Sequence, residues 1–251
     1  MRDTGPELSI VIPAYNESAD IEATLGAAVA CFDDLGVDGE VLVVDDGSRD
    51  DTVELVARFA ETYPAVVLLR NERNRGKGHS VRRGVLEARA EWILFADADE
   101  STPFSEAGKL LAVLRSGAAD VAIGSRALKE SDVARPQPWL RRVMGWVFRQ
   151  LVRLLVMRGL RDTQCGFKAF RRGAARDVFP RQTLDGFAFD VEVLFIARRL
   201  GYRVVEVPVR WLDSHDSRVH PLRDPARMFA DLLRIRFRAL RGVYGKRRGN
   251  P

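Results

Sequence analysis

Clusters of polar side chains follow three short apolar runs of the sequence, and their residue types suit metal and phosphate chemistry. The clusters are Ala14-Tyr-Asn-Glu17, Asp45-Asp-Gly-Ser48 and Asp97-Ala-Asp99. Carboxylates that converge repel one another unless a cation lies between them. Hard oxygen ligands of this kind suit Mg²⁺ or Mn²⁺, which proteins usually share with the phosphates of a substrate. The pattern therefore predicts a metal–nucleotide site, with Asp97 and Asp99 as the metal ligands.

An alternation of predicted strands and helices explains how these clusters would meet. Apolar runs predict strands at residues 8–13, 40–45, 66–69, 92–96 and 121–123, with helices between them that end near residues 32, 62, 90 and 115. Ser18 is the expected cap of the first helix and Asp50 of the second. The alternation predicts an α/β fold with a doubly wound, mostly parallel sheet. Because ligands bind beyond the carboxyl ends of strands in such sheets, the three clusters are expected along one edge.

A glycine-rich segment, Asn74-Arg-Gly-Lys-Gly78, opens the third predicted helix. Backbone N–H groups at a helix N-terminus and the Lys77 ammonium are both suited to a phosphate. The glycines serve equally well as a simple turn into the helix. No G-x-G-x-x-G follows the first strand and the sequence contains no G-x-x-x-x-G-K-[ST]. The sequence therefore disfavours dinucleotide oxidoreductases and P-loop NTPases.

The composition is that of a globular protein. The chain has 251 residues, 46% hydrophobic and 30% charged, with a formal net charge of +5. These values exclude a disordered or fibrous protein. The two cysteines, Cys31 and Cys165, cannot form a disulfide framework and indicate a reducing compartment. The basic balance suits nucleic acid, an anionic membrane surface or a phosphorylated substrate.

The positive charge is concentrated in two segments. Residues 135–158 carry six arginines and no acids, and residues 221–251 carry nine Lys or Arg and two Asp, which leaves a net charge of −8 for the remainder. Both segments have apolar residues at helical spacing, which core packing explains in most proteins. A stripe flanked by arginine is, however, typical of an interfacial helix, so we expect both to lie on an anionic membrane surface. Nucleic acid binding is disfavoured because no recognisable module accompanies the arginines. No run approaches the roughly 18 apolar residues of a membrane span.

The order and spacing of the motifs resemble those of the GT-A glycosyltransferases of family 2, and more narrowly the polyprenyl (dolichyl)-phosphate β-glucosyltransferases. Further segments that carry the resemblance are Gly124-Ser-Arg126, Asp162-Thr-Gln-Cys-Gly-Phe-Lys168, Phe189-Asp-Val-Glu192 and Val207-Pro-Val-Arg-Trp211. The resemblance covers residues 8–240. It implies a GT-A, Rossmann-like catalytic domain over residues 1–220, with the amphipathic helix 135–158 inserted. Residues 221–251 would form a C-terminal basic helix and tail.

The resemblance also implies an activity and a set of site residues. The expected reaction is the inverting transfer of a hexose, with UDP-glucose as donor and a polyprenyl or dolichyl phosphate as acceptor, at the cytoplasmic face of a membrane. The implied contacts of the nucleotide sugar are Pro13, Tyr15, Glu17, Asp45, Asp46, Lys77 and Asp97. Arg126 is expected near the acceptor phosphate. In the related mannosyl-phosphate synthases a glutamine follows the metal motif where this chain has Ser101, which makes GDP-mannose a less expected donor.

The chemistry leaves the need for a base open. Negative charge develops on the leaving nucleotide, and a divalent metal at Asp97 and Asp99 stabilises it, which gives Asp99 a catalytic role. A phosphate monoester, with a second pKa of about 6, is already largely anionic and needs no strong base. A hydroxyl acceptor would need one. Asp162 and Asp190 are the candidates to orient or deprotonate the acceptor.

Two other functions fit parts of the sequence. One is a soluble family 2 transferase that glycosylates a saccharide or small-molecule hydroxyl, with Asp190 as its catalytic residue. The other is a nucleotide-sugar binder without activity, which the intact Asp97-Ala-Asp99 motif disfavours.

Overall fold

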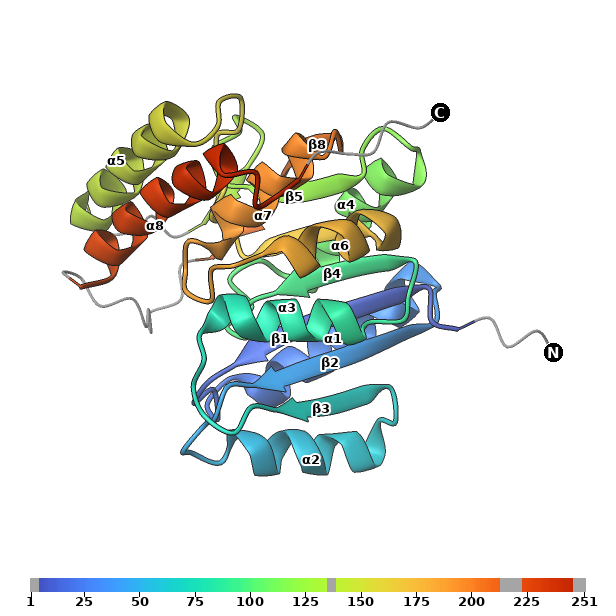
Figure 1. The fold of residues 1–251 in the computed structure, drawn as a ribbon. Coiled ribbons are helices and arrows are strands. Elements are labelled where there is room, and N and C mark those ends of the chain that lie inside the picture. The colour runs from blue at the N-terminus through green and yellow to red at the C-terminus, as the bar shows by residue number, and fades with distance from the viewer. Residues whose placement is uncertain (1–4, 135–138, 213–222, 246–251) are drawn as a thin grey trace.

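The computed structural model describes residues 5–134, 139–212 and 223–245. Its centre is a seven-stranded sheet in the order β3-β2-β1-β4-β7-β5-β8 (Figure 1). These strands are β1 (Leu8–Ala14), β2 (Gly39–Asp45), β3 (Val66–Arg70), β4 (Trp92–Ala96), β5 (Val121–Ser125), β7 (Phe167–Arg171) and β8 (Val204–Pro208). The short strands β6 (Asp132–Val133) and β9 (Arg210–Trp211) form a second, two-stranded sheet.

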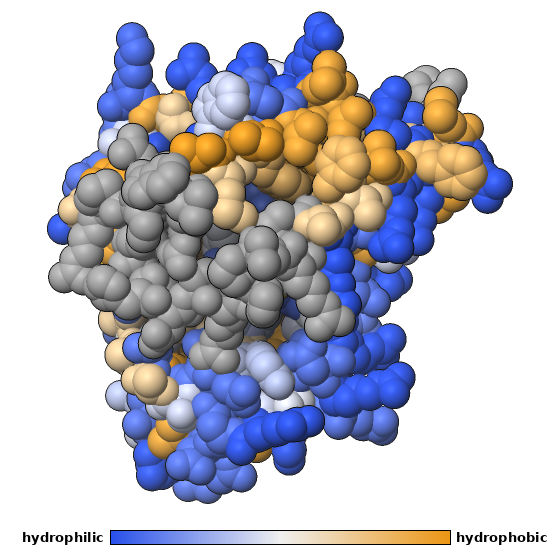
Figure 2. Space-filling view, turned by 90° about the vertical axis from the view of Figure 1, so that its left-hand side faces the viewer, coloured by the Kyte–Doolittle hydropathy of each residue, from blue (hydrophilic) through white to orange (hydrophobic). Residues whose placement is uncertain are grey.

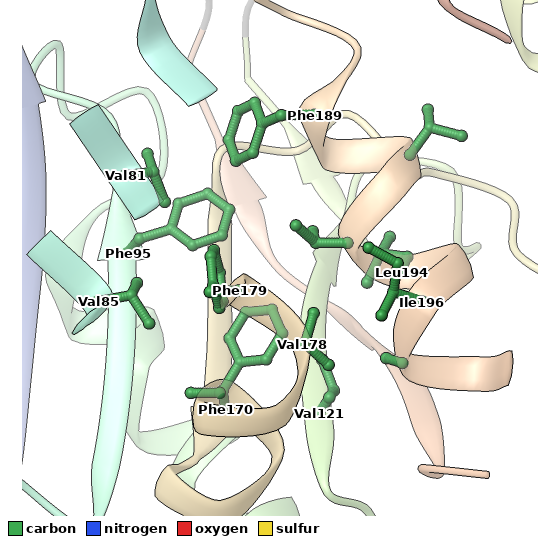
Figure 3. Close-up of a cluster of buried hydrophobic side chains, with 14 of the residues drawn as sticks. Val81, Val85, Phe95, Val121, Phe170, Val178, Phe179, Phe189, Leu194 and Ile196 are labelled. Atoms are coloured by element: carbon green, nitrogen blue, oxygen red, sulfur yellow. The ribbon is translucent and has the colours of Figure 1, made fainter. Parts of the chain in front are cut away.

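Helices cover both faces of the large sheet (Figure 1). They are α1 (Ile21–Leu35), α2 (Thr52–Thr62), α3 (Lys77–Glu87), α4 (Ala107–Arg115), α5 (Trp139–Leu155), α6 (Arg172–Val178), α7 (Phe189–Arg199) and α8 (Arg223–Leu240), with 3₁₀ turns η1 (Phe104–Glu106) and η2 (Phe179–Arg181). Side chains alternate across β1, so that Ile10 and Ile12 join the core on the α1 and α4 side and Val11 joins the other core. On that second side Phe95 of β4 lies between Val81 of α3 and Phe189 of α7 (Figure 3). The predicted α/β fold is confirmed.

The sheet departs from the parallel arrangement at one strand. The pairs β1–β2, β1–β4, β2–β3 and β5–β8 are parallel, whereas β7 is antiparallel to both β4 and β5. The sequence did not predict β7, because Lys168 interrupts its apolar residues. Lys168 is nevertheless fully buried, and its ammonium donates to Asp190 Oδ1 at 2.5 Å and to the Cys165 carbonyl at 2.6 Å. A partner 22 residues away along the chain thus makes this lysine compatible with a central strand.

The loop before α1 is fastened to the start of α2. Ser18 does not cap α1, so that prediction is wrong: the helix begins at Ile21, and the Ser18 N–H donates to Asp50 Oδ2 at 3.1 Å. Asp50 Oδ1 accepts the Thr52 hydroxyl at 2.6 Å and the Thr52 N–H at 3.2 Å. Asp51, and not the predicted Asp50, occupies the N-cap position of α2. The Asp50 carboxylate still accepts the N–H of the first helical residue, and it holds the β1–α1 loop as well.

The two basic amphipathic segments form α5 and α8, which pack against each other at one end of the molecule (Figure 1). Their inner residues, Val152, Val156, Leu232 and Ile235, are buried in the core. Their outer faces leave large apolar side chains exposed, and Figure 2 shows apolar residues gathered in a band on this end. No helix within the described ranges is both long and apolar enough to cross a bilayer. The predicted domain boundary near residue 220 lies outside the described residues.

The Asp50 contacts predict a pH-dependent contribution to stability. Burial alone would raise the pKa of Asp50, but hydrogen bonds from Thr52 and Ser18 lower it to about 2. A carboxylate with a lowered pKa stabilises the fold above its unfolded pKa of about 4, and this contribution disappears as the pH falls toward 2. We expect Asp50→Asn to lower the free energy of unfolding by about 1 kcal/mol at pH 7, measured by urea unfolding.

The loss should stay constant from pH 7 to about 5 and shrink below about 4. Asp51→Asn is the matched control, because the neighbouring Asp51 makes no side-chain hydrogen bond to the helix. An equal loss in both variants, or a loss independent of pH, would show that the Asp50 hydrogen bonds are not its source.

Candidate active site

A cleft of about 520 Å³ opens at the carboxyl ends of β1 and β2. It is lined by Tyr15, Asp45, Gly47, Ser48, Arg49, Arg70, Asn71, Glu72, Arg73 and Asn74. Asp45 is the last residue of β2, and its carboxylate accepts the N–H groups of Gly47 and Ser48, both at 3.2 Å. Tyr15 and Asp45 thus lie where the sequence predicted a nucleotide. Pro13, within β1, and Glu17, in the loop after it, do not line the cleft.

The Asp46 carboxylate accepts hydrogen bonds from a different segment than its neighbour Asp45 does. Its Oδ1 accepts the Asn71 amide at 2.8 Å and the Arg75 N–H at 2.9 Å, and its Oδ2 accepts the Gly76 N–H at 2.8 Å. The buried carboxylate therefore holds the segment that leads into α3. Asp46 positions this segment and is not part of the cleft lining.

The glycine-rich turn packs against the loop between η2 and α7. Gly76 has φ +103°, and a Cβ there would lie 2.4 Å from the Asp185 carbonyl oxygen. The N–H groups of Gly78 and His79 donate to the same oxygen at 2.8 and 3.3 Å. Because these N–H groups already donate to a carbonyl of the protein, they serve the turn into the helix and not a phosphate. The Lys77 side chain is the part of the segment that reaches the carboxylates.

Lys77 lies among three carboxylates at the end of β4. Its ammonium is 2.5 Å from Asp97 Oδ1. Burial alone would lower the pKa of this ammonium, but the carboxylates of Asp97, Asp190 and Asp99 raise it above its usual value. Asp97 Oδ1 is buried and accepts no hydrogen bond from the described residues, so this ion pair is its compensation. Asp99 Oδ1 accepts the Ser101 N–H at 3.0 Å.

Asp190 extends the cluster into the protein interior. It lies in the first turn of α7, pairs with the fully buried Lys168 at 2.5 Å, and is close enough to Lys77 for their charges to interact. Burial raises the pKa of Asp190, whereas the two lysines act in the opposite direction. Cations and anions therefore alternate from Lys168 through Asp190 and Lys77 to Asp97.

Arg126 and Asp162 form a second charged pair beside this cluster. The Arg126 Nε and Nη2 donate to the two Asp162 oxygens at 2.7 and 2.9 Å, and the N–H groups of Arg126 and Gln164 add bonds of 3.0 and 3.1 Å. Burial alone would raise the pKa of Asp162, but the guanidinium holds it well below its usual range. Asp162 and, more weakly, Asp97 raise the pKa of Arg126 against its burial. The guanidinium also lies 5.3 Å from the ring centroid of Trp211.

Two residues follow β1 and β4 in the left-handed backbone region. Asn16 has φ +53° and Glu100 has φ +49°, and they are the non-glycine residues with positive φ among those described. This region is costly for a glutamate in particular. Strained residues of this kind persist where surrounding contacts hold them, commonly at functional sites. Here they adjoin Tyr15 and Asp99.

Sequence reasoning assigned no role to Gly166 and Lys168, although both lie in the quoted Asp162–Lys168 motif. A Cβ at Gly166 would lie 2.1 Å from Asp97 Oδ2, so glycine at this position lets the Asp97 carboxylate approach β7. Lys168 holds Asp190 from the same strand. Neither contact is visible in the sequence, because each joins segments that only the sheet brings together.

The carboxylates at the end of β4 could supply only part of the coordination of a hard divalent cation. Within the described ranges, no group of three or more His, Cys, Asp or Glu side chains could hold a metal ion. Asp97 and Asp99 offer oxygen ligands of the appropriate chemistry. Substrate phosphates and water would have to supply the remaining ligands, as is common for Mg²⁺.

The architecture, with polar residues after β1, β2 and β4, is that of a GT-A glycosyltransferase. The solved glucosyl-3-phosphoglycerate synthase of Mycobacterium tuberculosis, in complex with Mn²⁺, uridine-diphosphate and phosphoglyceric acid, superposes with a TM-score of 0.67. The alignment covers 96% of this chain and 80% of that one at 21% sequence identity. Identity this low shows a shared fold alone.

The sequence comparisons are more specific. The profile of Glycosyl transferase family 2 matches residues 9–179. The dolichyl-phosphate beta-glucosyltransferase of Dictyostelium discoideum is 36% identical over 248 residues, 94% of this chain and 76% of that protein. The enzyme of the same name from Drosophila melanogaster is 38% identical over 250 residues, covering 95% and 77%. The chain belongs to glycosyl transferase family 2, as the sequence motifs indicated.

The contact between Gly166 and Asp97 predicts that a single methyl group disables the site. Gly166→Ala places a Cβ where the Asp97 carboxylate lies, so the carboxylate must move. Because a displacement of about 1 Å in a catalytic group costs roughly 10²-fold, we expect a loss of that order in glycosyl transfer. The measurement is kcat/KM for the nucleotide-sugar donor. Gly173→Ala is the control, since a Cβ at Gly173 meets no atom within 4 Å. Equal activity of the two variants would contradict the proposed placement of Asp97.

Proposed function

We propose that this protein transfers glucose from UDP-glucose to a dolichyl or polyprenyl phosphate, with inversion at the sugar carbon. The observation that carries the proposal is the position of Asp97, which has Lys77 2.5 Å away and Arg126 within electrostatic reach. This arrangement offers cations to two phosphorylated substrates around one acidic centre. The named relatives, aligned over nearly the whole chain, support the choice of dolichyl phosphate and glucose.

The donor half of the proposal uses the cleft and the end of β4. Tyr15 and Asp45 border the nucleotide, while Asp46 holds the segment that leads into α3. Pro13 lies within β1, and Glu17, in the loop after it, donates its N–H to the Thr52 hydroxyl. Lys77 neutralises the donor diphosphate. Asp97 and Asp99 would hold Mg²⁺ or Mn²⁺, which would stabilise the charge that develops on the leaving group. The mycobacterial synthase, solved with Mn²⁺ and uridine-diphosphate, supports this assignment by its shared fold.

The acceptor half uses Arg126. A guanidinium presents two parallel donors that match phosphate oxygens, and it keeps its charge at every physiological pH. Asp162 positions this side chain through a two-pronged ion pair. Its lowered pKa makes the Asp162 carboxylate a poor base, which agrees with an acceptor that needs none. Asp190 is paired with Lys168 and orients the cluster from the interior.

The exposed apolar faces of α5 and α8 suit a membrane surface. The exposed apolar side chains on this face include Val143, Trp146, Leu154, Phe229, Leu233, Phe237 and Leu240. Exposed arginines flank them, among them Arg153, Arg234, Arg236 and Arg241. Each basic residue near an anionic leaflet contributes about 1 kcal/mol of attraction. We place this face on the cytoplasmic leaflet, whose lipids carry the opposite charge, so that a lipid phosphate can enter the site.

A donor and acceptor panel tests the reaction. The purified protein with Mg²⁺ and dolichyl phosphate should form an acid-labile glucolipid from UDP-glucose and little product from GDP-mannose. Asp97→Ala and Asp99→Ala should each lower transfer by about 10²-fold to 10³-fold or more, because charge on the leaving diphosphate loses its stabilisation. Chelation of the metal should have the same effect, reversed by added Mn²⁺ or Mg²⁺.

Asp33→Ala is the control, because Asp33 lies on the exposed side of α1. Near-normal activity in both Asp97→Ala and Asp99→Ala would refute the metal assignment. Glycosylation of a saccharide hydroxyl in place of the lipid phosphate would refute the acceptor and favour the soluble transferase.

Membrane association is tested by co-sedimentation with liposomes that contain phosphatidylserine. We expect binding that weakens with rising salt, because arginine attraction is screened within about 10 Å at 0.1 M salt. The double variant Leu233→Glu/Phe237→Glu should lose most of this binding, since it places two carboxylates on the exposed face of α8. The control Tyr63→Glu/Val67→Glu changes two exposed apolar residues at the β3 edge, the opposite end of the molecule (Figure 1).

Equal binding of the two double variants would remove α8 from the membrane-facing surface. Absence of salt-sensitive binding by the unmodified protein would overturn the membrane placement itself.

A further inference from the structure

We propose that Glu192 is a positioning residue for the donor site and that Tyr244, beyond the end of α8, works through it to hold Lys77 in place. Within the described residues, no hydrogen bond or ion pair joins Glu192 to Lys77 or Asp97. It acts through the loop of residues 182–186, which packs against both glycines that flank Lys77. The inference rests on the proposed function only for the identity of the donor.

The Glu192 carboxylate joins three parts of the chain. It lies in the first turn of α7 and is fully buried. Its Oε2 accepts the N–H groups of Thr183 and Leu184 at 2.9 and 2.8 Å. Its Oε1 accepts the Thr183 hydroxyl and, at 2.7 Å, the Tyr244 hydroxyl. A buried carboxylate is costly without such donors, so the charge fixes the loop and the C-terminal segment on α7 together.

The loop in turn fixes the backbone on both sides of Lys77. The Asp185 carbonyl accepts the Gly78 N–H at 2.8 Å and lies against Gly76. The Gln182 side-chain amide donates at 2.8 Å to the Gly78 carbonyl and at 2.8 Å to the Leu184 carbonyl. Lys77 lies between these two glycines and is the first residue of α3. Displacement of the loop therefore moves the start of α3 and with it the ammonium that faces Asp97.

The segment that follows α8 contributes Tyr244 to this set of contacts. Tyr244 is fully buried, and its ring packs edge-on against Phe195 of α7 with 5.8 Å between centroids. Arg238 of α8 donates to the Thr183 hydroxyl, which gives the helix a second contact with the same loop. The helix whose outer face is proposed to meet the membrane is thus connected to Lys77 through Glu192.

The experiment compares two tyrosines whose hydroxyls each donate to a carboxylate. Tyr244→Phe removes the bond to Glu192, and the control Tyr202→Phe removes a bond of 2.5 Å to Asp177, away from the loop. Glu192→Gln keeps the side-chain shape but turns an amide toward the donors of Thr183 or Leu184. Affinity for UDP with Mn²⁺ is measured by calorimetry, and hydrogen exchange is measured at the amides of Gly78 and His79.

We expect affinity for UDP with Mn²⁺ to fall roughly tenfold in Glu192→Gln and by a smaller factor in Tyr244→Phe, with Tyr202→Phe unchanged. Exchange at Gly78 and His79 should speed up in the first two variants alone. KM for the nucleotide sugar should rise while KM for the lipid phosphate stays constant, a split that general destabilisation would not produce.

Unchanged exchange at both amides in Tyr244→Phe overturns the inference even if Glu192→Gln fails to fold. Equal effects of Tyr244→Phe and Tyr202→Phe, or parallel rises in both KM values, overturn it as well. The exchange measurement needs no ligand, so its outcome is independent of the donor's identity. Absence of UDP binding by the unmodified protein would count against the proposed function, whereas the exchange data would still decide whether Glu192 holds the start of α3.

Discussion

The rest of the site depends on the repulsion among carboxylates gathered at one edge of the sheet. Asp97, Asp99 and Asp190 lie so close together that each shifts the pKa of Lys77. Such groups stay ionised together only with cations between them. Lys77 and Lys168 supply two of these cations from within the chain. A divalent metal and its diphosphate ligand would enter a site in which two lysines already offset part of the charge of three carboxylates.

The antiparallel strand β7 is what makes this balance possible. It lies between β4 and β5 and brings the Asp162–Lys168 motif beside Asp97. The same strand carries Lys168 to Asp190 and follows the segment in which Asp162 holds Arg126. The parallel strands β1, β2 and β4 present the donor residues at their carboxyl ends, as the general rule for such sheets requires. Arg126, the proposed acceptor residue, follows the carboxyl end of β5, and its partner Asp162 lies in the segment before the antiparallel β7.

Local signals predicted five of the seven strands of the large sheet and most helices, but they missed β7 and β8. The errors and omissions arose where contacts distant in sequence decide the structure. Asp97 and Asp99 were predicted as metal ligands because an apolar run ends directly before them. Asp45 and Asp46 looked equivalent in the sequence, yet Asp45 is the last residue of β2 and Asp46 is the first residue beyond it. One lines the cleft and the other holds a segment about 30 residues further along the chain. Ser18 and Lys168 were misread or missed for the same reason: their partners, Asp50 and Asp190, are distant in sequence.

The amphipathic helices show how one apolar stripe can serve two purposes. When an apolar stripe on a helix is wider than the surface that it packs against, some of its residues remain exposed after the others are buried. In α8, Leu232 and Ile235 fill the core whereas Leu233 and Phe237 remain exposed. The inner side fixes the helix on the catalytic body, and so the outer face has a defined orientation relative to the site. Because the two segments that form these helices carry a net positive charge and the rest of the chain a net negative one, an anionic surface would attract the molecule by this face. Charge distribution and helix packing thus favour one orientation, in which α5 and α8 lie between the catalytic body and the lipid.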